Sequence, residues 1–102
     1  RSFDSILNDI ADKESKFLNI KSNINSISIP EGYLSYYNAL IDTFNLYSNY
    51  LKTLKVAIIF EKSSTNYKDN KDSIDKNYEN AFSKLDDVND SLNSLNKSLE
   101  NF

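Results

Sequence analysis

The 102-residue sequence contains no cysteine and no histidine. Without cysteine, the chain can form neither a disulfide nor a thiolate metal site. Without histidine, it lacks the residue that most often serves as a general base and as a metal ligand. These two absences remove many catalytic and metal-binding chemistries, and the sequence predicts no cofactor and no metal site.

Glycine and proline occur once each, as Gly32 and Pro30. Sandwiches and α/β folds need many turns, and turns draw heavily on these two residue types. A chain with so little of either is expected to consist of a few long elements. Hydrophobic residues make up 39% of the chain, which favours helices that each bury one narrow apolar stripe.

Blocks of positive charge and long hydrophobic runs are also missing. The net charge is −3 and lysines alternate with acidic residues, so the sequence predicts no surface for binding nucleic acid. The longest apolar run covers residues 56–60, far short of the roughly 18 residues of a membrane span. Membrane association is expected only through an N-terminal anchor that has been removed.

Apolar residues recur every seven positions in three segments, in two offset series per segment, as in amphipathic helices. The first helix is predicted over residues 2–26. Its series are Phe3, Ile10, Phe17 and Ile24, and Ile6, Ile20 and Ile27, the second interrupted by Lys13. Ser2 is expected to cap this helix, with Asp4 in its first turn.

Pro30 marks the first break, because proline disfavours helical backbone at the preceding residue and suits the first turn of a new helix. The second helix is predicted over residues 31–62. Its series have no polar interruption and consist of Tyr37, Phe44, Leu51 and Ile58, and of Tyr33, Leu40, Tyr47 and Leu54. As the most apolar of the three, this helix is expected to contact both others.

Residues 62–66 form the second break, where hydroxyl and amide side chains predict a turn and Ser63 or Ser64 is expected to cap the third helix. One long bent helix through this point is the alternative. The third helix is predicted over residues 65–100. Its series are Tyr67, Ile74, Ala81, Val88, Leu95 and Phe102, and Tyr78, Leu85, Leu92 and Leu99.

Short connections make consecutive helices antiparallel. The sequence therefore predicts one all-α domain over residues 1–102, an elongated up-down-up antiparallel three-helix bundle. Because the first helix is the shortest, part of the hairpin formed by the other two is expected to lack a third partner. An exposed stripe is predicted there, around Ile58, Ile59, Phe60 and Tyr67, as a binding surface or a site of self-association.

Five of the seven tyrosines lie on the second predicted helix. Heptad spacing explains Tyr33, Tyr37 and Tyr47 as packing residues. Tyr36 and Tyr50 lie outside the main series and share a face, so either they touch the flank of another helix or they form an exposed patch. Tyrosine combines a large apolar ring with a polar tip, and this pair is the predicted centre of a binding surface.

Acidic clusters occur on the third predicted helix, but their spacing does not fit a calcium loop. An EF-hand beginning at Asp87 would require glycine at its sixth position, where the chain has Leu92. A solvated helix face is the simpler interpretation. The sequence also has no glycine-rich phosphate loop and no nucleophile elbow, and no enzymatic activity is predicted.

The stretch Ile-Ser-Ile-Pro-Glu-Gly-Tyr at residues 27–33 opens a helix rich in tyrosine, leucine and phenylalanine. The helix after it carries Ala81, Leu85, Val88, Leu92 and Leu95. In this order the chain resembles the extracytoplasmic helical domains of small uncharacterised lipoproteins of low-GC Gram-positive bacteria. The resemblance covers most of the chain and rests on one proline and on heptad periodicity. It implies an extracytoplasmic location and a removed signal peptide with a lipid-modified cysteine.

The leading functional hypothesis is a non-enzymatic, extracytoplasmic helical-bundle interaction module that binds a protein partner. It predicts an exposed patch that is apolar or rich in tyrosine. One alternative is a structural coiled-coil or oligomerisation segment of a larger protein, which predicts a self-complementary surface. Another is a ligand-binding sensor bundle, which needs a cavity between the helices.

Overall fold

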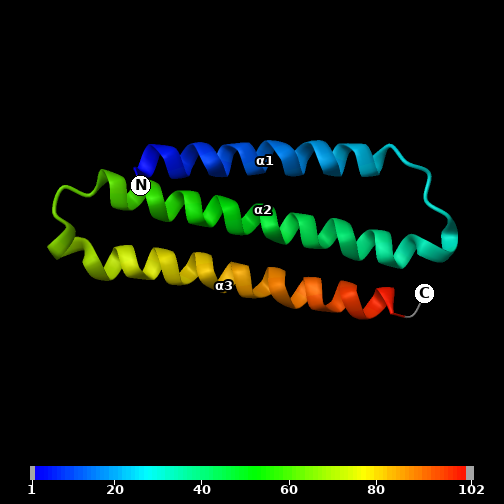
Figure 1. Ribbon diagram of the computed structural model, residues 1–102. Helices are drawn as coiled ribbons and strands as arrows, with labels where there is room; N and C mark the ends of the chain where they lie inside the picture. Colours follow the sequence, from blue (N-terminus) through cyan, green and yellow to red (C-terminus); the bar gives the residue numbers. More distant parts are fainter. Residues whose placement is uncertain (1, 101–102) are drawn as a thin grey trace.

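The computed structural model describes residues 2–100 and consists of three long helices joined by two short connections (Figure 1). The helices are α1 (Phe3–Asn25), α2 (Leu34–Ser63) and α3 (Tyr67–Leu99), with a short 3-10 turn, η1 (Glu31–Tyr33), before α2. They run antiparallel with α2 in the middle, and the molecule measures 55 × 23 × 17 Å. The predicted all-α, up-down-up three-helix bundle is confirmed. Phe102, the last member of one predicted series, lies outside the described residues.

Polar caps set two of the helix ends, and one predicted cap is wrong. Ser2 caps α1 as expected, since its Oγ accepts a hydrogen bond of 3.2 Å from the backbone N–H three residues later. The cap of α3 is Asn66, whose Oδ1 accepts from the backbone N–H of Asp69 at 3.3 Å. Ser63 and Ser64 do not cap α3. Ser63 is the last residue of α2, and Ser64 is the C-cap of that helix.

The break after Pro30 occurs where it was predicted, although α2 starts three residues later than expected. The backbone N–H of Tyr33 donates to the carbonyl of Pro30 at 2.9 Å and closes the 3-10 turn. Proline suits this position because its fixed φ matches the entry to a helical turn.

Packing between α2 and α3 follows one heptad series and uses small side chains. The buried residues of α3 are Ile74, Ala81, Val88 and Leu95. Ala81 and Ala57 of α2 are fully buried, and side chains this small let two helix axes approach closely. Thr43 is also buried; its Oγ1 donates to the carbonyl of Ala39 at 2.9 Å and lies 2.5 Å from Oγ of Ser91.

α1 is attached to α2 in a different way. Among its residues, all of which are described, only Ile10 is buried, in a core cluster with Leu51 and Ile58 of α2. Further along, the Phe17 ring stacks on Tyr47 with centroids 4.3 Å apart and meets Phe44 edge-on at 5.4 Å. This contact is therefore largely aromatic and half-exposed.

Polar side chains bridge α1 and α2 along their whole contact. They form two ion pairs, Asp4 with Lys62 and Glu14 with Lys55, and two hydrogen bonds, Lys21 with Asn45 and Tyr37 with Asn25. Exposed pairs of this kind contribute up to about 1 kcal/mol each. These polar pairs therefore determine the register of α1 on α2 but add little to the free energy of unfolding.

α1 and α3 do not pack closely against each other. In the described part of the chain, no Cα atom of α1 lies within 8 Å of a Cα atom of α3. Tyr78 of α3 nevertheless packs against the Ile10–Leu51–Ile58 cluster. The two outer helices therefore share a core only near the end that carries the α2–α3 turn.

Candidate functional site

The four residues predicted to form a binding surface are spread over the molecule. Tyr36 and Tyr50 lie on α2, fourteen positions or about 21 Å apart along the helix axis, and both are half-buried. Ile58 is buried near the end of α2, and Tyr67 is exposed at the first position of α3. The structure does not gather them in one place, and their role in binding stays a prediction.

The expected exposure of Ile58 is wrong. Its side chain is only 3% exposed and belongs to the core cluster with Ile10. The hairpin end is covered because α1 starts beside it, as the ion pair between Asp4 and Lys62 shows. The other members of the predicted stripe, Ile59, Phe60 and Tyr67, are exposed.

Of the two alternatives for Tyr36 and Tyr50, the structure favours contact with another helix. Thr43 and Ala57 belong to the same heptad series and are buried, and Thr43 contacts α3. Tyr50 packs against the core cluster and meets Tyr47 edge-on at 5.9 Å. Burial, together with the neighbouring Tyr47, raises the pKa of Tyr50.

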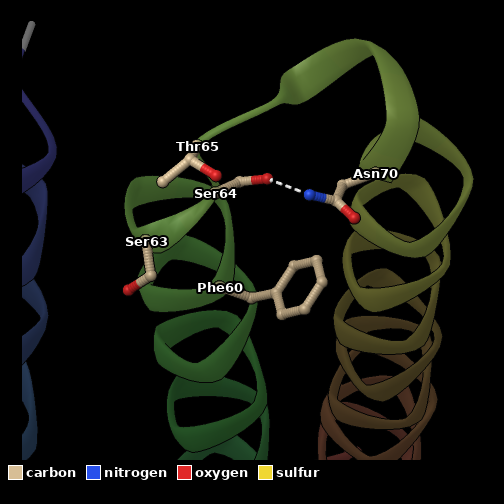
Figure 2. Close-up of a pocket in the computed structure, with 5 residues that line it drawn as sticks. All are labelled: Phe60, Ser63, Ser64, Thr65 and Asn70. Atoms are coloured by element: carbon tan, nitrogen blue, oxygen red, sulfur yellow. Dashed lines mark hydrogen bonds between the residues drawn. The ribbon is translucent and has the colours of Figure 1, made fainter.

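A shallow depression of about 210 Å³ lies at the α2–α3 turn, where the Phe60 ring extends toward α3 (Figure 2). Its other lining residues are Ser63, Ser64, Thr65 and Asn70, and Asn70 donates to Oγ of Ser64 at 2.7 Å. All five lining side chains are uncharged, and the volume falls below the roughly 300–1,000 Å³ of typical ligand sites. We interpret this feature as the packing of the turn.

Within residues 2–100, no group of three or more His, Cys, Asp or Glu residues is placed to hold a metal ion. None of the described helices is both long enough and apolar enough to cross a membrane. Asp75 accepts a hydrogen bond from Lys71 at 2.6 Å, which raises the pKa of that lysine. This pair is exposed and is typical of a solvated helix face.

The second heptad series of each helix lies on one side of α2. Ile6, Leu54 and Tyr78, one from each helix, all pack against the core cluster. Residues seven apart on one helix share a face, so the members of each series that lie within α1, α2 and α3 continue along the same side. We call this side the inner face; it comprises Ile6, Lys13, Ile20, Leu40, Tyr47, Leu54, Tyr78, Leu85, Leu92 and Leu99. Ile27 and Tyr33 lie in the connection between α1 and α2, at the end of this face.

Two polar contacts show which members of the inner face share a level. Nζ of Lys21 donates to Oδ1 of Asn45 at 2.7 Å, and Ser91 contacts Thr43. Asn45 and Thr43 are two residues apart, which is about 3 Å along α2. Positions 20–21 of α1 and 91–92 of α3 therefore lie at the same level, on helices that have no Cα atoms within 8 Å of each other.

Burial decreases along the inner face. Near the α2–α3 turn its residues Ile6, Leu54 and Tyr78 are half-buried. At the opposite end, five large apolar side chains are between 44% and 59% exposed: Ile20, Ile27, Tyr33, Leu92 and Leu99. We call these five residues the exposed end. Single exposed apolar residues are normal, but several on one side of a small protein indicate an interaction surface.

Sequence reasoning identified all three series but did not identify the exposed end. The available signal was Lys13, which interrupts the α1 series halfway along and is exposed in the structure. Closing α1 onto α3 would move this ammonium group out of water, which is unfavourable without a partner charge. Burial of the inner face accordingly ends near this level.

Comparisons of the chain with models of protein families, with curated protein sequences and with solved structures give no match. Its role therefore has to be argued from its own surface.

Proposed function

We propose that this chain is a non-enzymatic helical interaction module that binds an amphipathic helix of a protein partner at the exposed end. The observation that carries the proposal is the set of five half-exposed apolar residues at the end of the bundle where no Cα atom of α1 lies within 8 Å of a Cα atom of α3. An amphipathic helix presents its own apolar residues with the same spacing. The bound helix would cover the apolar side chains that α1 and α3 leave exposed at this end.

The available burial energy suits reversible binding. Covering a half-exposed leucine or isoleucine contributes on the order of 1 kcal/mol. Five such residues supply a few kcal/mol, from which the loss of translational and rotational freedom must be subtracted. We therefore expect a moderate affinity that depends on several of the five residues together.

The proposal is preferred to a ligand-binding bundle on grounds of surface shape. A small ligand needs a concave site that encloses most of its surface, whereas the depression at the α2–α3 turn is small and its polar groups bond to each other. The apolar side chains of the exposed end are spread along the bundle. This arrangement matches the apolar residues spaced along a helix better than it matches a compact small molecule.

The proposed location is extracytoplasmic, on the strength of the resemblance to small helical lipoproteins. Cells expressing the complete gene, tagged at its C-terminus, would be treated with protease while intact. Loss of the tagged protein, with a cytoplasmic control protein left intact, is the expected result. Protection until the cells are lysed would contradict this location.

The binding proposal is tested by titrating the isotope-labelled chain with a synthetic amphipathic helical peptide that carries leucine at the first and fourth heptad positions. Saturable amide shift changes are expected at residues 18–29, 33–36 and 90–99. Replacing both Ile20 and Leu92 with serine should weaken binding at least about tenfold, equivalent to about 1.4 kcal/mol.

The matched control is Val56→Ser, because Val56 is exposed but lies outside the inner face. This variant should bind the peptide like the parent chain. Absence of saturable shifts, or equal binding by the Ile20→Ser, Leu92→Ser double variant, would refute the proposal. Helical circular dichroism of each variant confirms that it is folded.

A further inference from the structure

We infer that the partner covering the exposed end is a second copy of this chain, in a two-fold dimer whose copies run parallel and present their exposed ends to each other. The inference rests on the proposed function and names the partner. It is carried by the charges that flank the exposed end and by the levels at which its apolar residues lie.

The two chain segments that border the exposed end, here called its flanks, carry opposite net charge when the charges on all their faces are counted. Residues 13–26, mostly α1, contain three lysines and one glutamate. Residues 84–100, mostly α3, contain four acidic residues and two lysines. The first flank is therefore net positive and the second net negative, by two charges each. Among residues 2–100, no ion pair joins these two flanks within one copy.

A second copy can be placed face to face with the first in two symmetric ways. A two-fold axis parallel to the helices puts α1 of each copy over α3 of the other. A two-fold axis across the helices puts α1 over α1 and α3 over α3. The first arrangement pairs opposite charges and the second pairs like charges, which is unfavourable. Charge therefore selects the parallel arrangement.

The apolar residues select the same arrangement. Ile20 and Leu92 share a level within one copy, as the contacts of Lys21 and Ser91 with α2 show. A two-fold axis parallel to the helices leaves the position of every residue along that axis unchanged. Ile20 of one copy therefore meets Leu92 of the other. The symmetry makes this contact twice. Both exposed ends then coincide, and each covers the other.

The size of the surface predicts a weak dimer. Five half-exposed apolar side chains provide on the order of 400 Å² per copy, about half of the roughly 800 Å² that each partner buries in a standard interface. Association should depend on concentration. It should also weaken when salt rises from about 0.05 M to about 0.5 M, because exposed charges are then screened.

Disulfide cross-linking tests the arrangement directly, since the chain has no cysteine of its own. Ile20→Cys and Leu92→Cys variants are prepared separately, mixed in equal amounts and mildly oxidised. The expected product is a dimer that links one variant to the other, while each variant alone stays mostly uncross-linked. A mixture of Val56→Cys and Leu92→Cys is the control and should not cross-link.

Charge exchange gives a second readout by light scattering. Lys16→Glu alone and Asp86→Lys alone should each lower the dimer fraction, because each creates like-charge contacts between α1 and α3 of the two copies. An equal mixture of the two variants should restore the dimer, since every pairing is then opposite. An arrangement with α1 over α1 predicts instead that neither variant alone lowers the dimer fraction, because each variant only replaces one like-charge contact with another.

Three other outcomes would overturn the inference. Cross-linking of Ile20→Cys with itself would show α1 over α1. A disulfide within one chain of the Ile20→Cys, Leu92→Cys double variant, without links between chains, would show that α1 closes onto α3. Failure to cross-link while the synthetic peptide still binds would remove the second copy as partner and leave the proposed function intact. If the peptide also fails to bind, both proposals fall.

Discussion

The two sides of α2 are packed in contrasting ways. Toward α3, a strict heptad of buried residues meets small side chains, and the helices approach closely. Toward α1, the buried cluster is limited to Ile10 with Leu51 and Ile58, against which Phe3, Ile6 and Leu7 pack. Aromatic rings and exposed polar pairs provide the rest of the contact. The α2–α3 hairpin is therefore the stable unit, and α1 is an attachment that can open locally.

This difference also explains where the exposed end lies. Beyond the level of Ile10, α1 has no buried residue that would draw it toward α3. The inner face is consequently covered only where Tyr78 reaches the core cluster. Weak attachment of α1 and exposure of the apolar residues beyond it are two aspects of the same packing.

The largest expected effect comes from the hairpin side. Ile74→Ala removes a side chain that is 1% exposed in the α2–α3 contact, and truncation of a buried isoleucine to alanine lowers the free energy of unfolding by about 2–5 kcal/mol. Urea denaturation followed by circular dichroism measures the change. A loss below about 1 kcal/mol would show that this contact is not the stable core.

The matched substitution on the other side is Ile10→Ala, which removes the same atoms from a residue that is 4% exposed in α1. We expect it to release α1 while the hairpin persists, so amide exchange should accelerate at residues 3–25 and stay slow at residues 74–95. Simultaneous loss of protection in all three helices would contradict the comparison and indicate one cooperative unit.

Much of the fold was predictable from the sequence, because heptad spacing and the lone proline determine helix number, length and direction. The start of α3 was less accessible: Ser63 or Ser64 was expected to cap this helix, and Asn66 is used instead. Such residues differ by only a few tenths of a kcal/mol as caps. Local sequence therefore does not decide between them.

The candidate site was harder to predict, since it depends on how the helices are placed relative to one another. Periodicity shows that Ile58 and Leu92 are apolar and on a seam, but not which of them a neighbouring helix covers. Helix lengths predicted an exposed stripe near the α2–α3 turn, but α1 starts level with the end of α2 and covers Ile58 there, whereas Ile59, Phe60 and Tyr67 are exposed as expected. The position of Lys13 was the better indicator.

A smaller effect is expected at the buried polar contact of the hairpin. Thr43→Val removes the hydroxyl that meets Ser91 and should lower the free energy of unfolding by about 1 kcal/mol. Thr53→Val is the matched control, because the Thr53 hydroxyl also bonds to the carbonyl four residues earlier, at 2.8 Å, within α2 itself. Equal destabilisation by both variants, measured in urea, would show that the contact between helices contributes nothing.

The smallest expected effect tests the residue that joins the two sides of α2. Tyr78 of α3 packs against the core cluster and donates its hydroxyl to Glu61 at 3.1 Å. Burial, and then the hydrogen bond and charge of Glu61, raise the pKa of Tyr78 to about 12. The folded chain thus holds the phenol proton more tightly than the unfolded chain, whose tyrosines titrate near pH ~10.

The stabilisation from Tyr78 is therefore complete below pH ~10 and is lost as the pH rises through the folded value of about 12. Solvent screening at this half-buried position keeps the loss small. Urea denaturation between these pH values should show a steeper decline for the parent chain than for Tyr78→Phe, which has no proton to release. Parallel declines would mean that the hydroxyl does not couple α3 to the core beneath α1, and that the two sides of α2 are joined by apolar contact alone.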